Sequence, residues 1–408
     1  MKCRHCHHEL QFTFLDLGSS PPSNAYLSKD ELAKPEIWYP LRLLVCEHCW
    51  LVQTEDFAGR DALFNSEYAY FSSFSSSWLQ HAKAYVDAVL ARYSLNSSSM
   101  VIEIASNDGY LLQYVKSAGI PCLGIEPTSS TAVAAMAKGL KVIERFFGVG
   151  LAKELVSSGC QADLMVANNV LAHVPDVNDF VSGFSALLKP NGVVTFEFPH
   201  LLQLVDNGQF DTVYHEHFSY LSLTSVTAIF QSNGLSVFDV EELGTHGGSL
   251  RVHAQRADTG LSQIGSAVDR MLTKENLAGM TLLTFYQGFQ SKPEAISRAL
   301  LSFLVQQARN GVSVAAYGAA AKGNTLLNYA GIRGFLLPYV VDRNPAKQDK
   351  FMPGSRIPIV DEEMLRRTKP AYVLILPWNL KQEVMAQLAY IRDWGGKFVT
   401  AIPELELV

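Results

Sequence analysis

Short runs of apolar and β-branched residues recur along residues 100–200, and stretches with helical spacing separate them. Strands that alternate with helices predict a parallel sheet covered on both faces, and hence an α/β fold. We expect helices at residues 131–138 and 179–188. The expected strands span residues 101–105, 122–125, 141–143, 162–167 and 192–198.

The first of these strands ends in a polar turn, residues 106–109, and a helix starts near Tyr110. Gly109 permits a sharp turn and a close approach of a ligand to the backbone. The helix start presents free N–H groups and the positive end of the helix dipole. Seventeen residues after Gly109 a second strand ends in Glu126, whose carboxylate can accept hydrogen bonds from both ribose hydroxyl groups of a nucleoside. This spacing predicts an adenosine-binding βαβ unit.

Ligands of a parallel sheet bind where its strands end, because the carboxyl ends of the strands meet at one edge. Phe146 follows the third expected strand, where an adenine ring can stack, and His173 lies in the polar segment after the fourth. The residues expected at this edge are Ser106, Asn107, Asp108, Glu126, Pro127, Asn168, Asn169, Glu197 and Pro199.

A second, smaller doubly wound domain is predicted nearer the C-terminus. Residues 312–317 form an expected strand that runs into the Gly-rich sequence GAAAKGNT and a helix from Leu326. Such a loop can hold a phosphate group at the helix N-terminus, and Lys322 adds positive charge there. Further strands are expected at residues 371–379 and 397–403.

Residues 208–234 carry the densest group of ionisable side chains. Two histidines around a carboxylate, flanked by phenol groups, can move a proton near neutral pH. A polar turn of this kind can equally cap and anchor its neighbours, so the residues alone leave catalysis and structure open. The group consists of Tyr214, His215, Glu216 and His217.

Residues 64–93 begin rich in Tyr, Phe and Ser and become an amphipathic helix from about Trp78. Tyr68 and Tyr70 lie two positions apart, so their rings share one side of an extended chain. The spacing by itself favours simple aromatic packing.

Two C-x-x-C pairs near the N-terminus predict a metal site. Two residues between thiolates let both sulfurs bind one metal, and two such pairs complete a tetrahedral zinc site with no open position, so we expect a structural metal. Two disulfides or a redox C-x-x-C are the alternatives, and the reducing compartment and the absence of a βαβ setting disfavour them. His5, His7, His8 and His48 are either solvated or substitutes for a cysteine. The expected ligands are Cys3, Cys6, Cys46 and Cys49.

Composition narrows the class of protein. The chain has 408 residues, 48% hydrophobic content and 18% charged residues, which suits a globular protein of two or three domains. A net charge of −6 argues against a nucleic-acid partner. The sequence has no apolar run of membrane-spanning length, and its first ten residues lack the apolar stretch of a signal peptide. We therefore expect no membrane association and a cytoplasmic location.

Several motifs together resemble one family, the S-adenosylmethionine-dependent C-methyltransferases of deoxysugar biosynthesis that methylate C3 of a dTDP-linked 4-keto sugar. The resemblance implies a small zinc-binding domain at residues 1–66. A class I methyltransferase domain with a doubly wound sheet would follow at 67–255, and a Rossmann-like sugar-nucleotide-binding domain at 256–408. The motifs are CxxC…CxxC, YAYFSSFSSSW, EIASNDGYLL, GIEP, NNVLAHVPD, YHEHFSYLS, HGGSLR and YGAAAKGNTLLN.

The resemblance also implies roles for individual residues. His217 would be the base that removes the proton next to the ketone, Glu216 can orient His217, and Tyr214 or Tyr68 can donate to the enolate oxygen. His173 would also lie around the substrate. S-adenosylmethionine would contact Glu103, Ser106, Asn107, Gly109, Glu126, Phe146 and Asn168. The nucleotide sugar, the expected partner, would contact Tyr70, Gly318, Lys322 and Asn324, and no obligate protein partner is inferred.

Two other functions compete with this interpretation. A nicotinamide oxidoreductase predicts a G-x-G-x-x-G turn, which neither Gly-rich loop has. A zinc-containing RNA methyltransferase needs a basic surface, and the chain has 33 basic against 39 acidic side chains. The turn after the first strand also departs from the common G-x-G pattern of methyltransferases, since Ala105 and Asn107 stand where glycines are usual.

Overall fold

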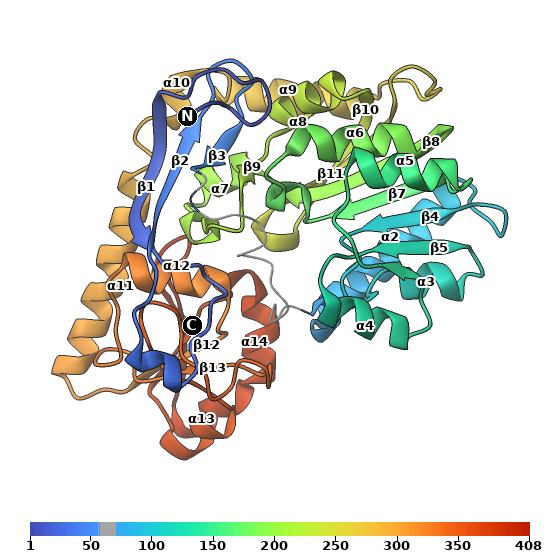
Figure 1. The fold of residues 1–408 in the computed structure, drawn as a ribbon. Helices are drawn as coiled ribbons and strands as arrows, with labels where there is room; N and C mark the ends of the chain where they lie inside the picture. The colour runs from blue at the N-terminus through green and yellow to red at the C-terminus, as the bar shows by residue number, and fades with distance from the viewer. Residues whose placement is uncertain (56, 58–70) are drawn as a thin grey trace.

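The computed structural model describes residues 1–55, 57 and 71–408, which form three sheets (Figure 1). The N-terminal sheet is antiparallel and has the strand order β1-β2-β3-β9. Its strands are β1 (Phe12–Ser20), β2 (Tyr39–Val45), β3 (Val52–Thr54) and β9 (Ser219–Tyr220).

The central sheet has seven strands in the order β10-β11-β8-β7-β4-β5-β6. Five are parallel to one another, which confirms the predicted doubly wound arrangement. The sheet also continues beyond the predicted five strands, because β11 and β10 add antiparallel to β8. The strands are β4 (Val101–Ile104), β5 (Cys122–Ile125), β6 (Val142–Ile143), β7 (Ala162–Asn168), β8 (Leu188–Pro199), β10 (Leu235–Leu243) and β11 (Ser249–Arg256).

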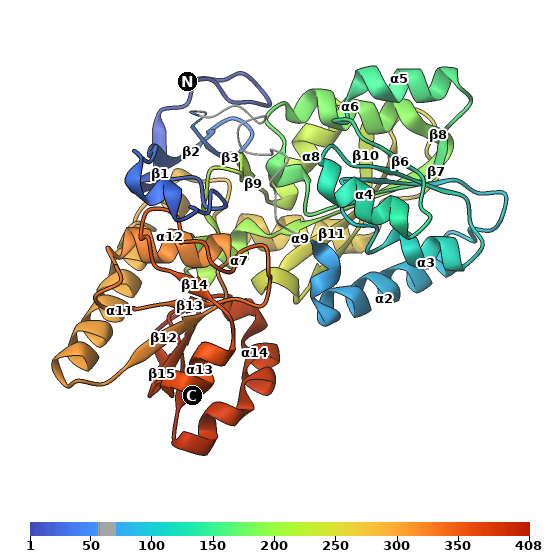
Figure 2. The same ribbon diagram turned by 60° about the horizontal axis from the view of Figure 1, so that its bottom comes forward.

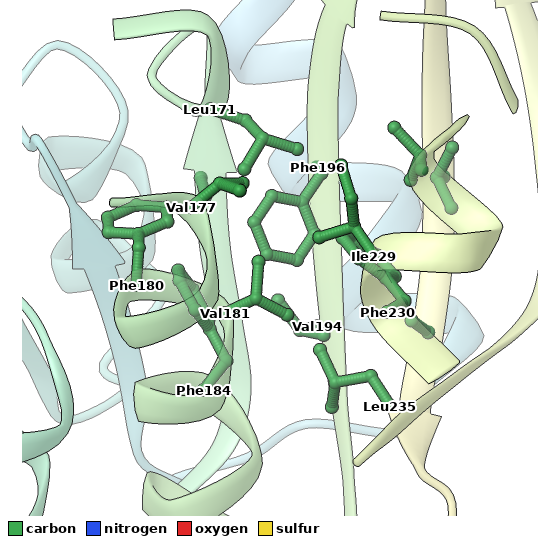
Figure 3. Close-up of a cluster of buried hydrophobic side chains, with 14 of the residues drawn as sticks. Leu171, Val177, Phe180, Val181, Phe184, Val194, Phe196, Ile229, Phe230 and Leu235 are labelled. Carbon is green, nitrogen blue, oxygen red and sulfur yellow. The ribbon is translucent and has the colours of Figure 1, made fainter. Parts of the chain in front are cut away.

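Helices cover both faces of this sheet. Along β8, alternate side chains point to the two opposite faces. Phe196 points toward the apolar side of the sheet and packs between Phe184 and Phe230 (Figure 3). Thr195 and Glu197 point to the opposite face, because successive side chains of a strand alternate. The helices are α2 (Ser76–Arg92), α3 (Leu112–Ser117), α4 (Ser129–Ala137), α5 (Val149–Ser157), α6 (Val177–Leu187), α8 (Leu223–Ser232) and α9 (Ser266–Leu277).

The C-terminal sheet has the order β14-β13-β12-β15-β16-β17, in which all strands except β17 are parallel. This confirms a second, Rossmann-like unit. Its strands are β12 (Val314–Tyr317), β13 (Val340–Val341), β14 (Ile359–Val360), β15 (Tyr372–Ile375), β16 (Lys397–Thr400) and β17 (Glu406–Leu407). The helices of this lobe are α11 (Ser291–Arg309), α12 (Ala321–Tyr329), α13 (Glu363–Thr368) and α14 (Lys381–Gln387), and α7 (Leu201–Asp206) and α10 (Leu283–Tyr286) lie before it.

The N-terminal lobe bridges the other two. Strand β1 runs beside α11, and Phe14 stacks on Phe289 at a centroid distance of 4.9 Å (Figure 1). The loop between β1 and β2 reaches the C-terminal sheet, where Leu27 pairs with Phe351. Strand β9 completes the N-terminal sheet, although it lies within the range expected for the methyltransferase domain. Figure 2 shows the three lobes arranged around a common centre.

No helix among the described residues has both the length and the apolar character that crossing a membrane requires.

Candidate active site

A cavity of about 420 Å³ lies where the three lobes meet. The carboxyl ends of β4, β5 and β7 form one wall, the turn before β9 forms a second, and the start of α12 forms a third. Residues from the N-terminal loop, Asn24 and Tyr26, complete the lining. The cavity therefore joins the strand ends of the central sheet, the turn that holds His217 and the Gly-rich sequence at residues 318–325.

The turn after β4 adopts a left-handed backbone at three alternate positions. The φ angles are +56° at Ala105, +49° at Asn107 and +76° at Gly109. Ala105 and Asn107 thus take the conformation that glycine provides in the common methyltransferase turn. The backbone N–H of Asn107 donates to Oε2 of Glu126 at 2.9 Å, and the N–H of Thr128 donates to Oε1 at 2.9 Å. Glu126 therefore ties its own strand end to the turn after β4.

The residues on this side of the cavity fit an adenosylated amino acid. Burial raises the pKa of Glu126, and its carboxyl group lies in the cavity wall beside Asn107. The ring of Phe146 is 38% exposed and also lines the wall, so it offers a face on which a base can stack. Oδ1 of Asn168 and Oδ1 of Asn169 are buried and have no hydrogen-bond partner among the described residues. Such orphaned acceptors at a cavity wall are suited to the ammonium group of a ligand.

His217 has both ring nitrogens engaged. Nδ1 lies 2.8 Å from the carbonyl oxygen of Thr212, so Nδ1 carries the proton and donates it. Nε2 therefore holds a lone pair, and it accepts a hydrogen bond from the hydroxyl group of Tyr214 at 2.7 Å. Tyr214 and His217 both line the cavity. The hydrogen bonds fix one tautomer of His217, with its basic nitrogen on the side of Tyr214.

His173 supports this arrangement from the neighbouring wall. Its Nδ1 donates to the carbonyl oxygen of Glu216 at 2.8 Å, and its ring centroid lies 4.6 Å from that of His217. Burial lowers the pKa of His173 to about 4. Burial also lowers the pKa of His217 well below the ordinary value, and His173, Lys322 and His246 lower it further. Both rings are therefore neutral at pH 7, and His217 is available as a proton acceptor.

Glu216 faces away from this pair. Its Oε1 accepts hydrogen bonds from the backbone N–H and the side-chain amide of Asn24, at 3.3 and 3.1 Å. Burial raises the pKa of its carboxyl group, and Glu216 is not among the residues that line the cavity. The idea that Glu216 orients His217 is wrong, because Thr212 and Tyr214 occupy both nitrogens of the ring. Glu216 instead anchors the N-terminal loop beside the cavity.

A cationic end of the cavity lies at the start of α12. Nζ of Lys322 donates to Oδ1 of Asn379 at 3.1 Å and lies 4.7 Å from the centroid of a Trp378 ring. The indole N–H of Trp378 donates to Oδ2 of Asp211 at 2.7 Å. Burial lowers the pKa of Lys322, and the charge of Asp211 opposes that shift.

A second lysine reaches the same end from the loop after β13. Nζ of Lys347 donates to the carbonyl oxygen of Ala319 at 2.8 Å and lies 5.2 Å from the ring centroid of Tyr26. The hydroxyl group of Tyr26 donates to the same carbonyl at 2.6 Å. Lys322 and Lys347 both line the cavity, which makes this end suitable for a polyanionic group.

The four cysteines of the two C-x-x-C pairs converge, with all four sulfur atoms within 4.8 Å of one another. Sγ of Cys3 lies 3.6 Å from Sγ of Cys49, and Sγ of Cys6 lies 3.4 Å from Sγ of Cys46. A tetrahedral zinc centre with Zn–S bonds of about 2.3 Å requires sulfur–sulfur separations of about 3.8 Å. The amide of Gln53 also donates to Sγ of Cys3 at 3.3 Å, as a partner of a metal-bound thiolate would. The cluster fits zinc.

Three family models match consecutive parts of the chain. The model described as "Putative zinc binding domain" matches residues 3–64, "Methyltransferase domain" matches 78–240, and "C-methyltransferase C-terminal domain" matches 244–403. The chain is 33% identical to the C-methyltransferase NovU of Streptomyces niveus over 407 residues, which cover 100% of this chain and 96% of that protein. The chain belongs to the C-methyltransferase family. It is an S-adenosylmethionine-dependent enzyme, and the part that matches the zinc-binding model holds four cysteines that lie close together.

The comparison with solved structures gives partial matches to methyltransferases. The magnesium protoporphyrin IX methyltransferase of Synechocystis PCC 6803 with bound SAM is 17% identical with a TM-score of 0.34, and the match covers 44% of this chain and 79% of that one. A SAM-dependent methyltransferase of Archaeoglobus fulgidus is 15% identical with a TM-score of 0.34, over 43% of this chain and 94% of that one.

Several residues predicted for this C-methyltransferase's site do not line its cavity. Gly109 packs against Leu140, since a Cβ atom at Gly109 would lie 2.2 Å from Cδ1 of that leucine. Gly318 packs in the same way against Pro377. The others absent from the lining are buried: Glu103, Ser106 and Asn324. Two predicted residues, Tyr68 and Tyr70, lie outside the described residues.

Other residues of this C-methyltransferase line the cavity without having been predicted to bind or react. Tyr110 and Trp78 stack at 5.8 Å on the cofactor side. Four further residues of the lining were not predicted, and they come from segments whose sequence carries no motif pointing to a ligand: Asn24, Tyr26, Lys347 and Asn379. Asn169 was expected at this edge of the sheet, and His246 lies in the motif HGGSLR but had no assigned role. The Gly-Gly pair after His246 indicates a tight turn, and this is the feature of the sequence that could have drawn attention to His246.

Proposed function

We propose that this C-methyltransferase methylates the carbon next to the ketone of a nucleotide-linked 4-keto-deoxysugar, with dTDP as the nucleotide. The observation that carries the proposal is the shared cavity. Glu126 lies in its wall on the cofactor side, and Lys322 lies at its cationic end. His217, a neutral histidine that can accept a proton, lines the same cavity. These are the three functions that such a reaction needs in one enclosed space.

The reaction begins with a proton transfer. A C–H bond next to a ketone breaks when its proton passes to Nε2 of His217, and the electron pair moves onto the ketone oxygen to give an enolate. S-adenosylmethionine, when bound, would supply an electrophilic methyl group. The enolate carbon would form the new C–C bond with it as the S–CH3 bond breaks, so that the ketone re-forms and S-adenosylhomocysteine leaves. His217 then returns its proton to solvent.

Tyr214 regulates access to the base. Its hydroxyl group donates to Nε2 of His217, so a substrate C–H group must take the place of that hydroxyl before the proton can move. Thr212 holds the other ring nitrogen throughout, which keeps the basic nitrogen aimed at the cavity. His173 packs on the ring and restricts its motion.

The cationic end supports the choice of a nucleotide-linked substrate. Lys322 lies in the first turn of α12 and Lys347 in the loop after β13, both in the C-terminal lobe, and both line the cavity. Two ammonium groups can neutralise a diphosphate between them. The sugar would then extend from this end toward His217, and the cofactor-side wall lies opposite.

The test is mass spectrometry of a panel of dTDP-4-keto-deoxysugars incubated with the enzyme and S-adenosylmethionine carrying a ¹³C-methyl group. The expected product gains one labelled methyl group on carbon next to the ketone, as its ¹³C NMR shift would show. Transfer to oxygen or nitrogen, or a methylated RNA in a parallel incubation, would overturn the proposal. Membership of the C-methyltransferase family argues against the alternative of a nicotinamide oxidoreductase.

His217→Asn tests the role of His217 as the base. The shorter amide can still donate to Thr212 as Nδ1 does, but the variant has no atom equivalent to the basic Nε2. We expect loss of methyl transfer and of solvent exchange at the substrate carbon, with unchanged affinity for S-adenosylhomocysteine. Retained exchange would remove His217 from the role of base.

A further inference from the structure

The Gly-rich turn between β10 and β11 places a third histidine in the cavity. His246 lines the wall that also holds His173 and His217. Its backbone is left-handed, with φ of 53° and ψ of 20°. A non-glycine residue in this conformation is strained, and such strain persists where surrounding contacts fix it, often at functional sites.

Several contacts fix the turn around His246. The hydroxyl group of Thr245 donates to Oε1 of Glu197 at 3.1 Å, which ties the turn to the end of β8. The amide of Gln209 donates to the carbonyl oxygen of Gly247 at 2.7 Å. A Cβ atom at Gly247 would lie 2.4 Å from the Trp378 ring, so the turn also packs tightly against the C-terminal lobe. The position of the imidazole is therefore built into the fold.

The hydrogen-bonding state of His246 follows from its neighbour. Nδ2 of Asn169 lies 3.3 Å from Nε2 of His246, so the amide donates to that nitrogen and the imidazole proton resides on Nδ1. The Trp78 ring meets the imidazole edge to face at 5.1 Å. Nδ1 of His246 has no hydrogen-bond partner among the described residues. Burial lowers the pKa of His246 to about 4, so at neutral pH the ring is a neutral N–H donor.

The proposed reaction requires a donor of this kind. Charge accumulates on the ketone oxygen as the enolate forms, and preorganised donors at such an oxygen supply a large part of catalysis. The hydroxyl proton of Tyr214 is held by Nε2 of His217 until a substrate displaces it, so a donor that is preorganised for the ketone oxygen has to come from another residue. Asn169 and His246 lie beside the ends of β7 and β8, at the sheet edge where the cofactor and substrate meet.

We propose that His246 is a further catalytic residue, which donates its Nδ1 proton in a hydrogen bond to the ketone oxygen as the enolate forms. Asn169 is a positioning residue that fixes the tautomer of His246 through Nε2. This inference rests on the proposed function, because it assumes a ketone substrate. The ring remains neutral, and the proton stays on Nδ1 throughout.

Two substitutions by amide residues distinguish the roles of the two ring nitrogens of His246. In His246→Asn the amide nitrogen lies near the position of Nδ1, so a donor remains, and Asn tolerates a left-handed backbone. In His246→Gln the amide lies near the position of Nε2, so the donor to the substrate is lost. We expect His246→Gln to lower kcat for solvent exchange and for methyl transfer by about 100-fold or more. His246→Asn should stay within about tenfold of wild type.

Lys369 provides the control for backbone strain. It also has a left-handed backbone, with φ of 48°, and its side chain is exposed and does not line the cavity. Lys369→Gln and Lys369→Asn should leave kcat unchanged and should show how much thermal stability the substitution costs by itself. S-adenosylhomocysteine affinity and thermal melting of all four variants identify any that fail to fold.

Asn169→Asp tests the tautomer. A carboxylate at this position accepts a hydrogen bond from a protonated Nε2, so it favours the tautomer whose proton is on Nε2, or a charged ring. We expect a lower kcat, an unchanged KM for the nucleotide sugar and a new pH dependence of kcat. Activity of Asn169→Asp equal to wild type would exclude the positioning role.

The outcomes distinguish the two proposals. A wild-type enzyme that methylates no keto sugar would refute the proposed function. A wild-type enzyme that does so, with equal activity in His246→Asn and His246→Gln, would overturn the role of His246 alone. An effect of His246→Gln on KM alone would also overturn the role of His246. So would loss of solvent exchange in Tyr68→Phe together with retained solvent exchange in His246→Gln.

Discussion

The hydroxyl group of Tyr214 lies 2.7 Å from Nε2 of His217 and donates to its lone pair. The interaction stabilises the neutral imidazole, because a protonated ring would have no acceptor to offer. It acts in the same direction as burial, which is the main cause of the low pKa of His217. The pair therefore keeps the proposed base unprotonated but partly masked until a substrate enters.

Tyr214→Phe should raise the pKa of His217, since it removes a hydrogen bond that the neutral ring alone can accept. Activity requires the neutral ring, so the acidic limb of the pH–rate profile should move to higher pH by about half to one pH unit. Solvent exchange at the substrate carbon, measured by NMR between pH 4 and 8, reports this limb. Tyr93→Phe is the control, because Tyr93 bonds His253 outside the cavity. An acidic limb that moves to lower pH would contradict the assignment.

Glu126→Ala should weaken binding of S-adenosylhomocysteine by about 10- to 100-fold, because a charged acceptor for the ribose hydroxyl groups is lost. Since burial raises the pKa of Glu126, wild-type affinity should also fall as the pH drops through that raised pKa. Isothermal titration calorimetry measures both effects. Glu126→Gln keeps an acceptor at Oε1 for Thr128 and should lose less affinity. Unchanged affinity in Glu126→Ala would refute the ribose assignment.

The cofactor side was predictable because its signals are local. Glu126 ends one strand and Asn107 follows another, and parallel strands bring such ends together. The left-handed backbone of Ala105 was not predictable, because alanine rarely adopts that conformation, and the identity of Asn107 permits it without requiring it. The sequence therefore located the turn but not its contacts, and it overestimated Gly109, whose missing side chain leaves room for Leu140.

The rest of the site depends on contacts between distant segments. Leu27 pairs with Phe351, and no periodicity within the loop between β1 and β2 could reveal that partner. His246 reaches Asn169 because β11 adds antiparallel beside β8, and this pairing joins segments that are far apart in the sequence. Glu216 and His217 are adjacent in the sequence, yet their side chains diverge, so the contact between them that the resemblance implied is not present.

Cys46→Ser should lower the zinc content from one atom per chain to well below one, because three thiolates bind zinc less tightly than four. The thermal midpoint should fall as well, since Cys3, Cys46 and Cys49 pack in one core with residues of the methyltransferase domain such as Leu171. Metal analysis and thermal melting measure the two effects. Cys160→Ser is the control, as Cys160 lies outside the cluster. A full complement of zinc in Cys46→Ser would contradict the four-thiolate site.

Asp211 should make the stability of the enzyme depend on pH in an unusual direction. Burial raises its pKa to about 7, and the charge of Lys322 opposes that rise. In the unfolded chain an aspartate titrates near pH 4, so between about pH 4 and pH 7 the folded state holds a proton that the unfolded state has released. The contribution of Asp211 to the free energy of unfolding therefore falls as the pH rises through this window, by up to a few kcal/mol.

Asp211→Asn removes this dependence, because the amide is neutral at every pH and its oxygen can still accept the indole N–H of Trp378. The thermal midpoint of the variant, relative to wild type, should be higher at pH 8 than at pH 5. The comparison is between two proteins at each pH, so other titrating groups largely cancel. Asp393→Asn, at an exposed position, should show no such change. If Asp211→Asn gains no stability relative to wild type between pH 5 and pH 8, the carboxyl group of Asp211 is already ionised in the folded protein at pH 5, and the prediction is wrong.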